Sequence, residues 1–329
     1  MIKNSKVKVN KEEEVKAENL LRPKSFDQFI GQEEIKKIRI FVDAAKSRNE
    51  QLEHFLFYGP PGLGKTTLAT ILANENGKNL KITTGPSITK VSDLSSIISN
   101  LNEGDFLFID EIHRLNRNVE EVLYSAMEDF AIDIIVGKGP SARTVRLDVP
   151  KFTLVGATTK VSLLTKPLRD RFGSIHKLKF YNNKELAQII KRSSDILSVV
   201  VDKSGCIEIA KRSKGTPRIA NRLLRRVRDV AQVQKVKKVD GNFVIETCIM
   251  LGIDSEGLDE ESKKLLSVIY DNFEGGPVGL STLAAALSED KDTVSDVLEP
   301  FLIQKGFIKR TSSGRVITAK GIEHLEKPM

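Results

Sequence analysis

The sequence has few cysteines and no long apolar segment. Cys206 and Cys248 are its only cysteines, and their spacing indicates neither a zinc cage nor a redox motif. Both lie among apolar residues, so we expect buried, reduced thiols. No apolar run approaches the ~18 residues that cross a bilayer, and residues 1–18 lack the hydrophobic centre of a secretory signal. These absences predict a cytoplasmic chain without a membrane span, preceded by a mobile tail over residues 1–18.

The excess of positive charge is modest. The 329 residues carry a formal net charge of +8, with 40% hydrophobic and 29% charged residues. Such a composition is typical of a globular protein of two or three domains. A polyanionic partner and a merely solvated basic surface both fit the excess. It is concentrated in residues 183–240, which hold 15 Lys or Arg against 6 Asp or Glu.

One glycine-rich stretch fits a complete nucleotide-binding pattern. Residues 59–67 read GPPGLGKTT, preceded by an apolar strand-like run at residues 54–58 and followed by a helical pattern. Its glycines allow backbone N–H groups to surround phosphates at the positive end of the helix. We predict ATP binding here, with Lys65 at the β- and γ-phosphates and Thr66 as a ligand of Mg²⁺. The loop residues predicted to contact the nucleotide are Gly62, Gly64, Lys65, Thr66 and Thr67.

Two adjacent carboxylates follow the next strongly apolar run. Residues 106–109 predict a strand buried on both faces, and Asp110 and Glu111 come at its C-terminal end. Ligands of open α/β sheets bind at this end of the strands. Asp110 is suited to hold Mg²⁺ through water, and Glu111 to orient or deprotonate the water that attacks the γ-phosphate. With the P-loop, the pair predicts ATP hydrolysis rather than binding alone.

Residues 132–136 and 144–147 predict a β-hairpin inserted between a helix and the next core strand. Its alternation of apolar and polar residues is imperfect, which leaves two interpretations open. The hairpin is either an exposed docking site for another protein or a hairpin packed on its own domain. The strand after it, residues 152–159, ends in Thr158 and Thr159, which we expect beside the carboxylate strand and near the γ-phosphate.

The remaining sequence predicts two further units. Residues 184–240 form a helical segment in which Arg218 follows a Gly-Thr-Pro helix start. A cation there opposes the helix dipole, and an anion nearby would explain it. Residues 261–320 predict three helices and a β-hairpin, the pattern of a winged helix, which could bind nucleic acid or another protein. The last helix carries five acids in residues 288–299, so we expect the wing to contact nucleic acid, largely independently of sequence.

A P-loop core, a helical lid and a C-terminal winged helix in this order resemble the motors of the AAA+ family. Over about residues 20–320 the chain is similar to the RuvB family, the Holliday junction branch-migration motors. The strings that carry this likeness are Leu21-Arg22-Pro23, Ile30-Gly31-Gln32, residues 59–67, residues 110–115, Gly156-Ala157-Thr158-Thr159, residues 168–173 and residues 215–221. The resemblance implies an α/β fold: an AAA+ ATPase core with a parallel sheet, then a small all-α lid, then a winged-helix domain. The implied boundaries are 19–181, 182–255 and 256–329.

The resemblance implies roles that spacing does not reveal. Arg171 would be the arginine finger that reaches a neighbouring subunit's site, Arg218 the lid sensor, and either Thr158 or Thr159 the γ-phosphate sensor. Further residues near the nucleotide would be Leu21, Arg22, Ile30, Glu128, Asp129, Phe130 and Tyr181. Lys160 stands where the family usually has Arg, and lysine cannot make the bidentate contact of an arginine.

The implied function is an ATP-driven motor: a homo-hexameric ring on duplex DNA that moves four-way Holliday junctions in homologous recombination, DNA repair and the SOS response. The hairpin 132–147 would dock the junction-binding partner RuvA, and a junction resolvase would join the complex. Arg310 and Arg315 on the wing would touch DNA. One rival is a nucleotide-gated DNA-binding switch, against which the acidic 288–299 segment argues. The other is a protein-remodelling ATPase, whose turnover DNA would not stimulate.

Overall fold

The computed structural model describes residues 18–48, 50–136 and 143–326. It divides into two compact units, Pro23–Lys179 and a second unit that combines Met1–Arg22 with Phe180–Met329. Each unit is described by itself. Apart from Glu18, the predicted tail over residues 1–18 lies outside the described residues.

The first unit is built on a five-stranded parallel sheet with the strand order β2-β3-β6-β1-β7. Its strands are β1 (Phe55–Tyr58), β2 (Leu80–Thr84), β3 (Phe106–Asp110), β6 (Thr153–Thr158) and β7 (Ser174–Lys177). Every residue of β6 is buried, as is all of β3 except its last residue. These two strands therefore read as continuous apolar runs rather than alternating ones. The predicted position of β6 beside the carboxylate strand β3 is confirmed.

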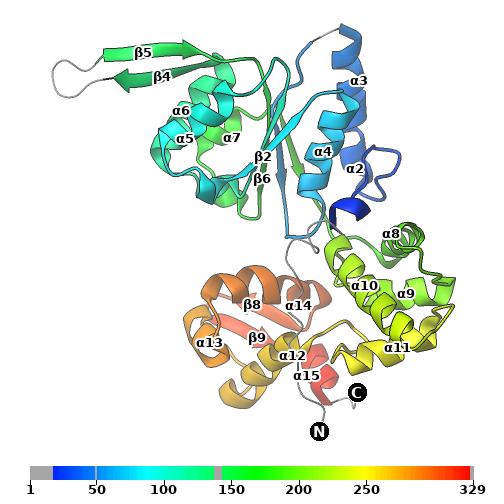
Figure 1. Ribbon diagram of the computed structural model, residues 1–329. Helices are drawn as coiled ribbons and strands as arrows, with labels where there is room; N and C mark the ends of the chain where they lie inside the picture. Colours follow the sequence, from blue (N-terminus) through cyan, green and yellow to red (C-terminus); the bar gives the residue numbers. More distant parts are fainter. Residues whose placement is uncertain (1–17, 49, 137–142, 327–329) are drawn as a thin grey trace. The chain divides into compact units, whose positions relative to one another are not determined.

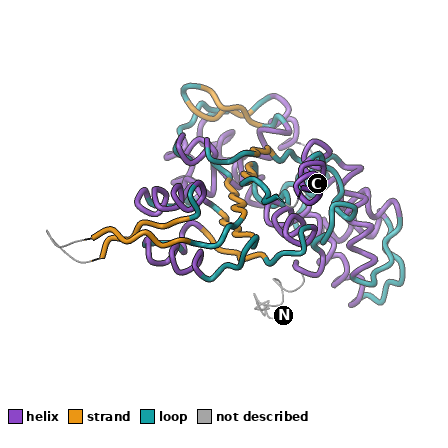
Figure 2. Tube along the Cα trace, turned by 90° about the horizontal axis from the view of Figure 1, so that it is seen from above, coloured by secondary structure: helices purple, strands orange, loops and turns teal. Residues whose placement is uncertain are grey.

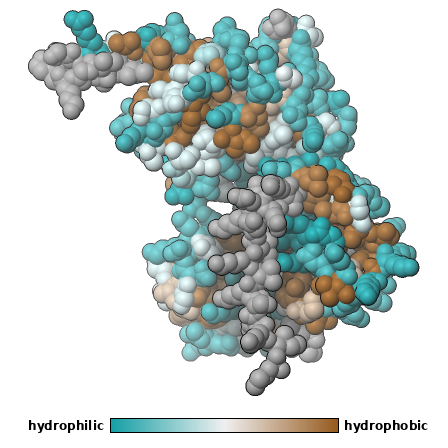
Figure 3. Space-filling view, viewed as in Figure 1, coloured by the Kyte–Doolittle hydropathy of each residue, from teal (hydrophilic) through white to brown (hydrophobic). Residues whose placement is uncertain are grey.

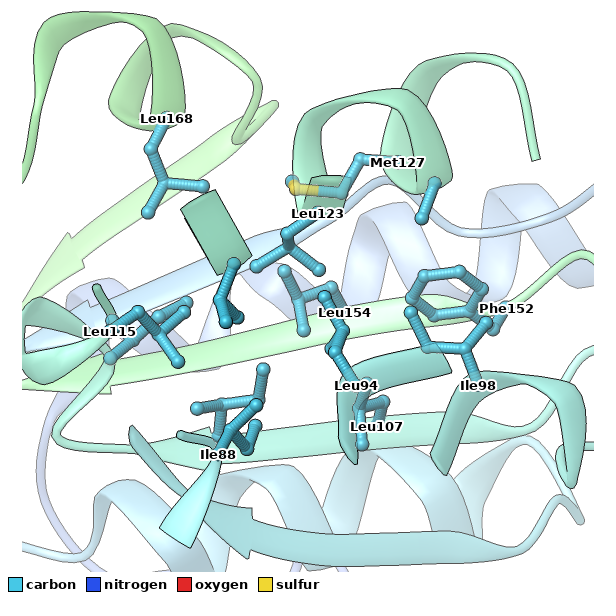
Figure 4. Packing of buried hydrophobic residues seen from close by; sticks show 14 of the residues in the cluster. Ile88, Leu94, Ile98, Leu107, Leu115, Leu123, Met127, Phe152, Leu154 and Leu168 are labelled. Carbon is cyan, nitrogen blue, oxygen red and sulfur yellow. The ribbon is translucent and has the colours of Figure 1, made fainter. Parts of the chain in front are cut away.

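Helices cover both faces of this sheet (Figure 1). They are α2 (Glu33–Lys36), α3 (Ile38–Arg48), α4 (Lys65–Glu75), α5 (Val91–Ser99), α6 (Arg117–Glu128) and α7 (Lys166–Asp170). Lys37 separates α2 from α3, so residues 33–48 do not form one continuous helix. Between the sheet and α5–α7 lies an apolar core in which Leu94, Leu123 and Phe152 are fully buried (Figure 4).

The predicted hairpin is present as the antiparallel strands β4 (Ala131–Val136) and β5 (Arg143–Asp148). It extends away from the sheet in both ribbon views (Figures 1 and 2). All six residues of β5 are exposed, including Val145 and Leu147 at 49% and 40%. In the space-filling view hydrophobic and hydrophilic atoms lie side by side at this hairpin (Figure 3). The connecting residues 137–142 lie outside the described residues.

The second unit begins with a helical domain. Its helices are α8 (Asn183–Ile196), α9 (Lys203–Lys211), α10 (Pro217–Val233) and α11 (Gly241–Met250). Asn182, Asp202 and Asp240 cap three of them, each side chain accepting a hydrogen bond from a backbone N–H in the first turn. On α10 the buried residues Ala220, Leu223, Leu224 and Val227 form one stripe. Cys206 and Cys248 are free and buried, as predicted.

A winged-helix arrangement completes this unit. Its helical elements are α12 (Glu260–Ser267), η5 (Val268–Asn272), α13 (Leu280–Leu287), η6 (Thr293–Leu298) and α14 (Glu299–Lys305). The wing consists of β8 (Ile308–Thr311) and β9 (Gly314–Ile317), and α15 (Ala319–Glu326) follows. The sequence analysis missed α15 and the wider, π-helical winding of η5 and η6. Glu299, one of the five acids counted in residues 288–299, is fully buried.

Candidate nucleotide site and DNA-binding wing

The P-loop, residues 59–67, connects the end of β1 to the start of α4. Gly59, Gly62 and Gly64 have φ angles of 143°, 80° and 102°, a region that residues with a side chain avoid. At Gly59 an added Cβ would lie 2.7 Å from the carbonyl oxygen of Leu178. Glycine is therefore required there. The loop leads into the first turn of α4, and the positive end of a helix favours an anion there.

Lys65 folds back over this loop. Its Nζ donates hydrogen bonds to the carbonyl oxygens of Gly59 at 2.8 Å and Pro60 at 2.9 Å, and the residue is 8% exposed. The contacts hold a positive charge against the loop at the start of α4. The positive charge of Lys65 and the positive end of α4 together favour binding of a polyphosphate at the P-loop.

Two carboxylates end β3 at the same edge of the sheet. Asp110 Oδ1 accepts a hydrogen bond from the N–H of Glu111 at 2.9 Å, whereas Glu111 Oε2 lies 3.5 Å from Arg114 Nη1. Glu111 has a φ of 49°, which is uncommon for a residue with a side chain and concentrates at functional sites. The two adjacent acids therefore have different surroundings, as two different roles require.

The tip of β6 lies between the P-loop strand and the carboxylate strand. Thr158 is opposite Tyr58 of β1, and β3 pairs with the other side of β6. The Thr158 hydroxyl is fully buried, 2.8 Å from Nδ1 of His113, and accepts a hydrogen bond from the N–H of Lys160 at 3.0 Å. Thr159 is partly exposed. Both threonines reach the P-loop edge, but the hydroxyl of Thr158 is already engaged.

Glu128 and Arg171 lie at the opposite edge of the sheet, where the strands begin. Nε2 of His54, which immediately precedes β1, is 3.0 Å from the carbonyl oxygen of Met127. On the other side, the N–H of Ser174, the first residue of β7, donates to the carbonyl of His54. A strand rises about 3.3 Å per residue, so four to six residues separate the two edges by roughly 15 Å. The structure therefore does not bring Glu128 or Arg171 to their own P-loop.

Arg171 is held at this edge by three groups. Its Nη2 lies 2.9 Å from Glu128 Oε2, and its Nη1 donates to the carbonyl of Pro167 at 2.9 Å. The guanidinium also stacks on the ring of Tyr124, 4.7 Å from its centroid, a cation–π contact. The Arg171 side chain is 23% exposed, so the group is presented at the surface in a fixed orientation.

The two residues after Glu128 share its position at the strand-starting edge. Asp129 Oδ2 pairs with Arg146 of the hairpin at 3.2 Å. The ring of Phe130 meets Phe152 edge to face, with 6.2 Å between the centroids. Ile30, in the same unit, is partly exposed.

Four other predicted nucleotide residues belong to the second unit. Leu21 is buried, and its carbonyl accepts a hydrogen bond from Arg192 Nη1 at 2.9 Å. Tyr181 is 5% exposed, and its N–H donates to the carbonyl of Gly215 at 2.9 Å. Gly215 lies two residues before α10, so this bond ties Tyr181 to the loop that leads into that helix.

Arg218 is the second residue of α10 and its side chain is 61% exposed. Its Nε lies 3.4 Å from Glu18 Oε1, and the same carboxylate is 4.0 Å from Arg22 Nη2. The Glu18 carboxylate is thus an anion near the start of α10, as the position of Arg218 predicted. Both arginines implied to contact a nucleotide converge on one carboxylate.

The two wing arginines face each other across the hairpin. Arg310 of β8 is directly opposite Arg315 of β9. Both guanidiniums contact the carboxylate of Glu299 at the start of α14.

Three family models match consecutive parts of the chain. They are the Holliday junction DNA helicase RuvB P-loop domain over residues 21–178, the RuvB AAA lid domain over residues 181–254 and the RuvB C-terminal winged helix domain over residues 255–326. The chain belongs to the RuvB family.

Solved structures of a bacterial RuvB are similar over nearly the whole chain. The Thermotoga maritima RuvB Holliday junction branch migration motor has 50% sequence identity and a TM-score of 0.86, covering 94% of this chain and 99% of that one. One mutant of the same protein gives 50% identity and a TM-score of 0.87, with coverage of 94% and 99%. Another gives 51% and 0.87, with coverage of 93% and 100%. The predicted AAA+ core, lid and winged helix are therefore confirmed.

As a RuvB-family P-loop ATPase, the chain binds a nucleotide and is an enzyme of the ATPase and helicase type. Within the described residues no three His, Cys, Asp or Glu side chains form a metal cluster. A Mg²⁺ ion in such an enzyme keeps several waters and takes one or two protein ligands beside the phosphates. The Thr66 hydroxyl on the first turn of α4 and the Asp110 carboxylate at the end of β3 fit that donor set. No described helix is long and apolar enough to cross a membrane.

Sequence reasoning missed the residues that surround Arg171. Glu120 is 7% exposed and accepts hydrogen bonds from the hydroxyls of Tyr124, at 2.7 Å, and Thr165. Thr165 also caps α7, the helix that immediately precedes Arg171. Burial, together with the hydrogen bond to Glu120, raises the pKa of Tyr124 to about 12, so its hydroxyl stays protonated. An acid, a tyrosine and a threonine spread over 46 residues have no signature in the sequence.

Proposed function

We propose that this chain is an ATP-driven motor that forms a hexameric ring on duplex DNA and promotes branch migration of Holliday junctions. The observation that carries the ring is the division of the predicted catalytic residues between two edges of one sheet. The P-loop, Asp110, Glu111 and the β6 threonines lie at one edge, while Arg171 lies at the other. A site that needs both groups requires a neighbouring subunit. A closed ring supplies one to every member.

In this assignment the P-loop N–H groups and Lys65 bind the β- and γ-phosphates, and Glu111 orients the attacking water and accepts its proton. Mg²⁺, when bound, offsets phosphate charge, and Thr66 and Asp110 would hold it. We assign the γ-phosphate sensor to Thr159, because the Thr158 hydroxyl is engaged by His113 and Lys160. Thr158 would position the tip of the strand instead.

Arg171 would enter the neighbour's site as the arginine finger. Its guanidinium would exchange Glu128 for the γ-phosphate, while the ring of Tyr124 keeps the side chain extended. The segment Glu128–Phe130 lies at the same edge, so we propose that it faces the neighbour's nucleotide. Within each subunit, Leu21, Arg22, Ile30, Tyr181 and the lid sensor Arg218 would contact that subunit's own nucleotide.

The other proposals concern organisation and partners. The domains would span residues 19–181, 182–255 and 256–329, after a tail of residues 1–18. The 132–147 hairpin would dock the junction-binding protein RuvA, with a junction resolvase in the same complex. The wing would contact the DNA backbone through Arg310 and Arg315. The setting would be cytoplasmic recombination and repair within the SOS response.

Mixing two inactive variants tests the shared site. Arg171→Ala and Glu111→Gln should each bind ATP but lose turnover by about 10²-fold or more. In a mixed ring, some interfaces combine an intact Glu111 with a neighbour's intact Arg171. We therefore expect turnover to return when the two variants are mixed. Mixtures that stay as inactive as either variant alone would contradict the assignment in trans.

Strand exchange on a synthetic four-way junction tests the function itself. We expect ATP-dependent exchange that RuvA increases, and ATP hydrolysis that duplex DNA stimulates at low salt. Hydrolysis indifferent to DNA would instead favour a protein-remodelling ATPase. The Arg171→Ala variant is the matched control, because it should bind DNA and ATP without moving the junction.

A further inference from the structure

Glu299 is a buried acid at the centre of the predicted DNA-binding surface. It is the first residue of α14 and has 0% exposure. Its Oε1 accepts a hydrogen bond from Arg315 Nε at 2.8 Å, and its Oε2 accepts one from Arg310 Nε at 2.7 Å. Arg310 Nη2 lies 2.6 Å from the same Oε2. A carboxylate taken out of water is tolerated only when paired in this way.

The Glu299 carboxylate offsets the repulsion between two positive charges in the wing. Arg310 and Arg315 are directly opposed on neighbouring antiparallel strands, and like charges in that relation repel. Glu299 accepts from both: Oε1 from Arg315, and Oε2 from Arg310 and, at 3.4 Å, also from Arg315. The hairpin can therefore carry two arginines in register, and it is fastened to α14 by the same contacts.

The two arginines are held differently. The Arg315 side chain is 15% exposed, and its Nε and Nη2 reach the two oxygens of Glu299 at 2.8 and 3.4 Å. The Arg310 side chain is 48% exposed. Its Nη2 also donates to the carbonyl of Ser295 at 3.2 Å. These contacts use Nε and Nη2, which lie along one edge of the planar Arg310 guanidinium and fix its orientation. Nη1 lies on the opposite edge.

We propose that Glu299 is a positioning residue for DNA binding: it orients Arg310 so that the free edge of its guanidinium meets a backbone phosphate, and it anchors the wing through Arg315. Arg310 then makes the direct contact, and Arg315 acts mainly by holding the wing on α14. The inference rests on the proposed contact between wing and DNA.

A positioning role and simple electrostatics predict opposite changes in DNA affinity for the substitution Glu299→Gln. Glu299→Gln removes a negative charge close to the DNA surface, so electrostatics alone predicts tighter binding. Positioning predicts weaker binding, because Arg310 loses the partner that fixes its orientation and its repulsion from Arg315 is no longer offset. Glu289→Gln is the matched control. It is the same substitution at an exposed acid in the same segment, and it should leave affinity unchanged or slightly raised.

The measurement is the affinity of the full chain for a fluorescent 30-base-pair duplex across a range of salt concentrations. We expect Glu299→Gln to weaken binding about five- to tenfold, the cost of about one ordinary hydrogen bond. The slope of log K against log salt should fall by about 0.9, as one phosphate contact is lost. We expect Arg310→Ala to reproduce both changes. In the Arg310→Ala background, Glu299→Gln should change affinity by less than about twofold. Unchanged or tighter binding by Glu299→Gln, or full additivity of the two losses, would overturn the proposal.

Failure of the wing–DNA contact and failure of the positioning role give different results in these variants. If Arg310→Ala itself leaves affinity and salt slope unchanged, the proposed wing contact is wrong. If only Glu299→Gln has no effect, the positioning role alone is wrong. Should Glu299→Gln lower the melting temperature of the full chain, Glu299→Asp replaces it, because it keeps the charge and shortens the reach. A purely electrostatic role predicts wild-type binding for Glu299→Asp, whereas positioning predicts a loss.

Discussion

His54 joins three elements at the edge of the sheet where the strands begin. Its Nδ1 accepts a hydrogen bond from the N–H of Leu154 at 2.9 Å, and its Nε2 is 3.0 Å from the carbonyl of Met127. Because Nδ1 must accept, Nε2 carries the proton and the ring is neutral. Burial lowers the pKa of His54. This ring ties β1 and β6 to the end of α6, next to Glu128 and Arg171.

The pH dependence of stability follows from this arrangement. The unfolded chain takes up a proton at His54 near pH 6.5, whereas the folded chain resists it. The contribution of His54 to the free energy of unfolding is therefore complete above pH 6.5 and is lost as the pH falls below it. We expect a loss of at most ~1.4 kcal/mol per pH unit, measured by urea unfolding between pH 7.5 and 5. In His54→Gln this part of the slope should disappear.

His176 sets the control for that measurement. Burial also lowers its pKa, so the His54→Gln variant should keep a smaller slope of the same sign. The pair His54→Gln and His176→Gln separates the two contributions. If the curves of wild type and His54→Gln run parallel from pH 7.5 to 5, the buried neutral ring does not govern the acid sensitivity.

At the scale of elements, β5 of the hairpin β4–β5 is exposed along its whole length. All of β5 is exposed, yet it retains the apolar side chains of Val145 and Leu147. An apolar strand face that its own domain leaves uncovered is typical of a protein-binding surface. Of the two interpretations of the hairpin, this exposure favours docking.

Substitution on β5 tests the docking proposal. Val145→Asp places a charge in the apolar contact, and we expect binding to RuvA to weaken at least tenfold, because an unpaired buried charge is costly. Thr144→Asp is the matched control on the neighbouring, oppositely directed position. ATP hydrolysis without RuvA should be unchanged in both. Equal loss of RuvA binding in both variants, or in neither, would contradict recognition by the apolar face. Calorimetry with purified RuvA measures it.

Local patterns predicted the elements well where one physical signal dominates. The apolar runs of β3 and β6 and the glycine-rich turn after β1 were placed correctly. Winding within helices was less predictable. The break at Lys37 and the π-helical η5 and η6 depend on tertiary packing rather than on periodicity. Gly321 obscured α15, since glycine disfavours a helix interior.

Contacts between distant residues decided what the sequence could not. Glu299 reads as one more exposed acid until the wing folds onto α14 and buries it. The separation of Arg171 from the P-loop depends on strand order and direction, which motif spacing does not contain. The proposal that Thr159 rather than Thr158 is the sensor likewise rests on the position of His113.

At the scale of the whole molecule, the lid helices and the winged helix belong to one compact unit. Lys214, in the loop before α10, pairs with Asp259 Oδ2 at 2.8 Å and donates to Ser262 Oγ at 2.9 Å. An added Cβ on Gly257 would lie 2.6 Å from the carbonyl oxygen of Arg212. The Lys214–Asp259 ion pair and the close backbone approach at Gly257 thus join the loop before α10 to α12, the first helix of the winged-helix domain. A rotation of the lid would carry the wing with it.

That connection predicts a variant in which hydrolysis continues but movement is inefficient. Lys214→Met keeps the aliphatic stem near the Phe301 ring and removes the charge that pairs with Asp259. The Lys214 side chain is 13% exposed and that of Asp259 39%, so this partly buried pair should cost more to break than a fully exposed one, and the contact should loosen. We expect DNA-stimulated ATP hydrolysis within about twofold of wild type, because Lys214 touches no proposed catalytic group. Junction movement per ATP should be reduced severalfold.

The control Lys211→Met removes an exposed lysine paired with Glu208 on the surface of α9 and should preserve the ratio of junction movement to ATP hydrolysed. Paired measurements of phosphate release and strand exchange give that ratio directly. A wild-type ratio in Lys214→Met would mean that lid motion reaches the wing by another route, whereas parallel loss of hydrolysis and exchange would place Lys214 in the nucleotide site itself.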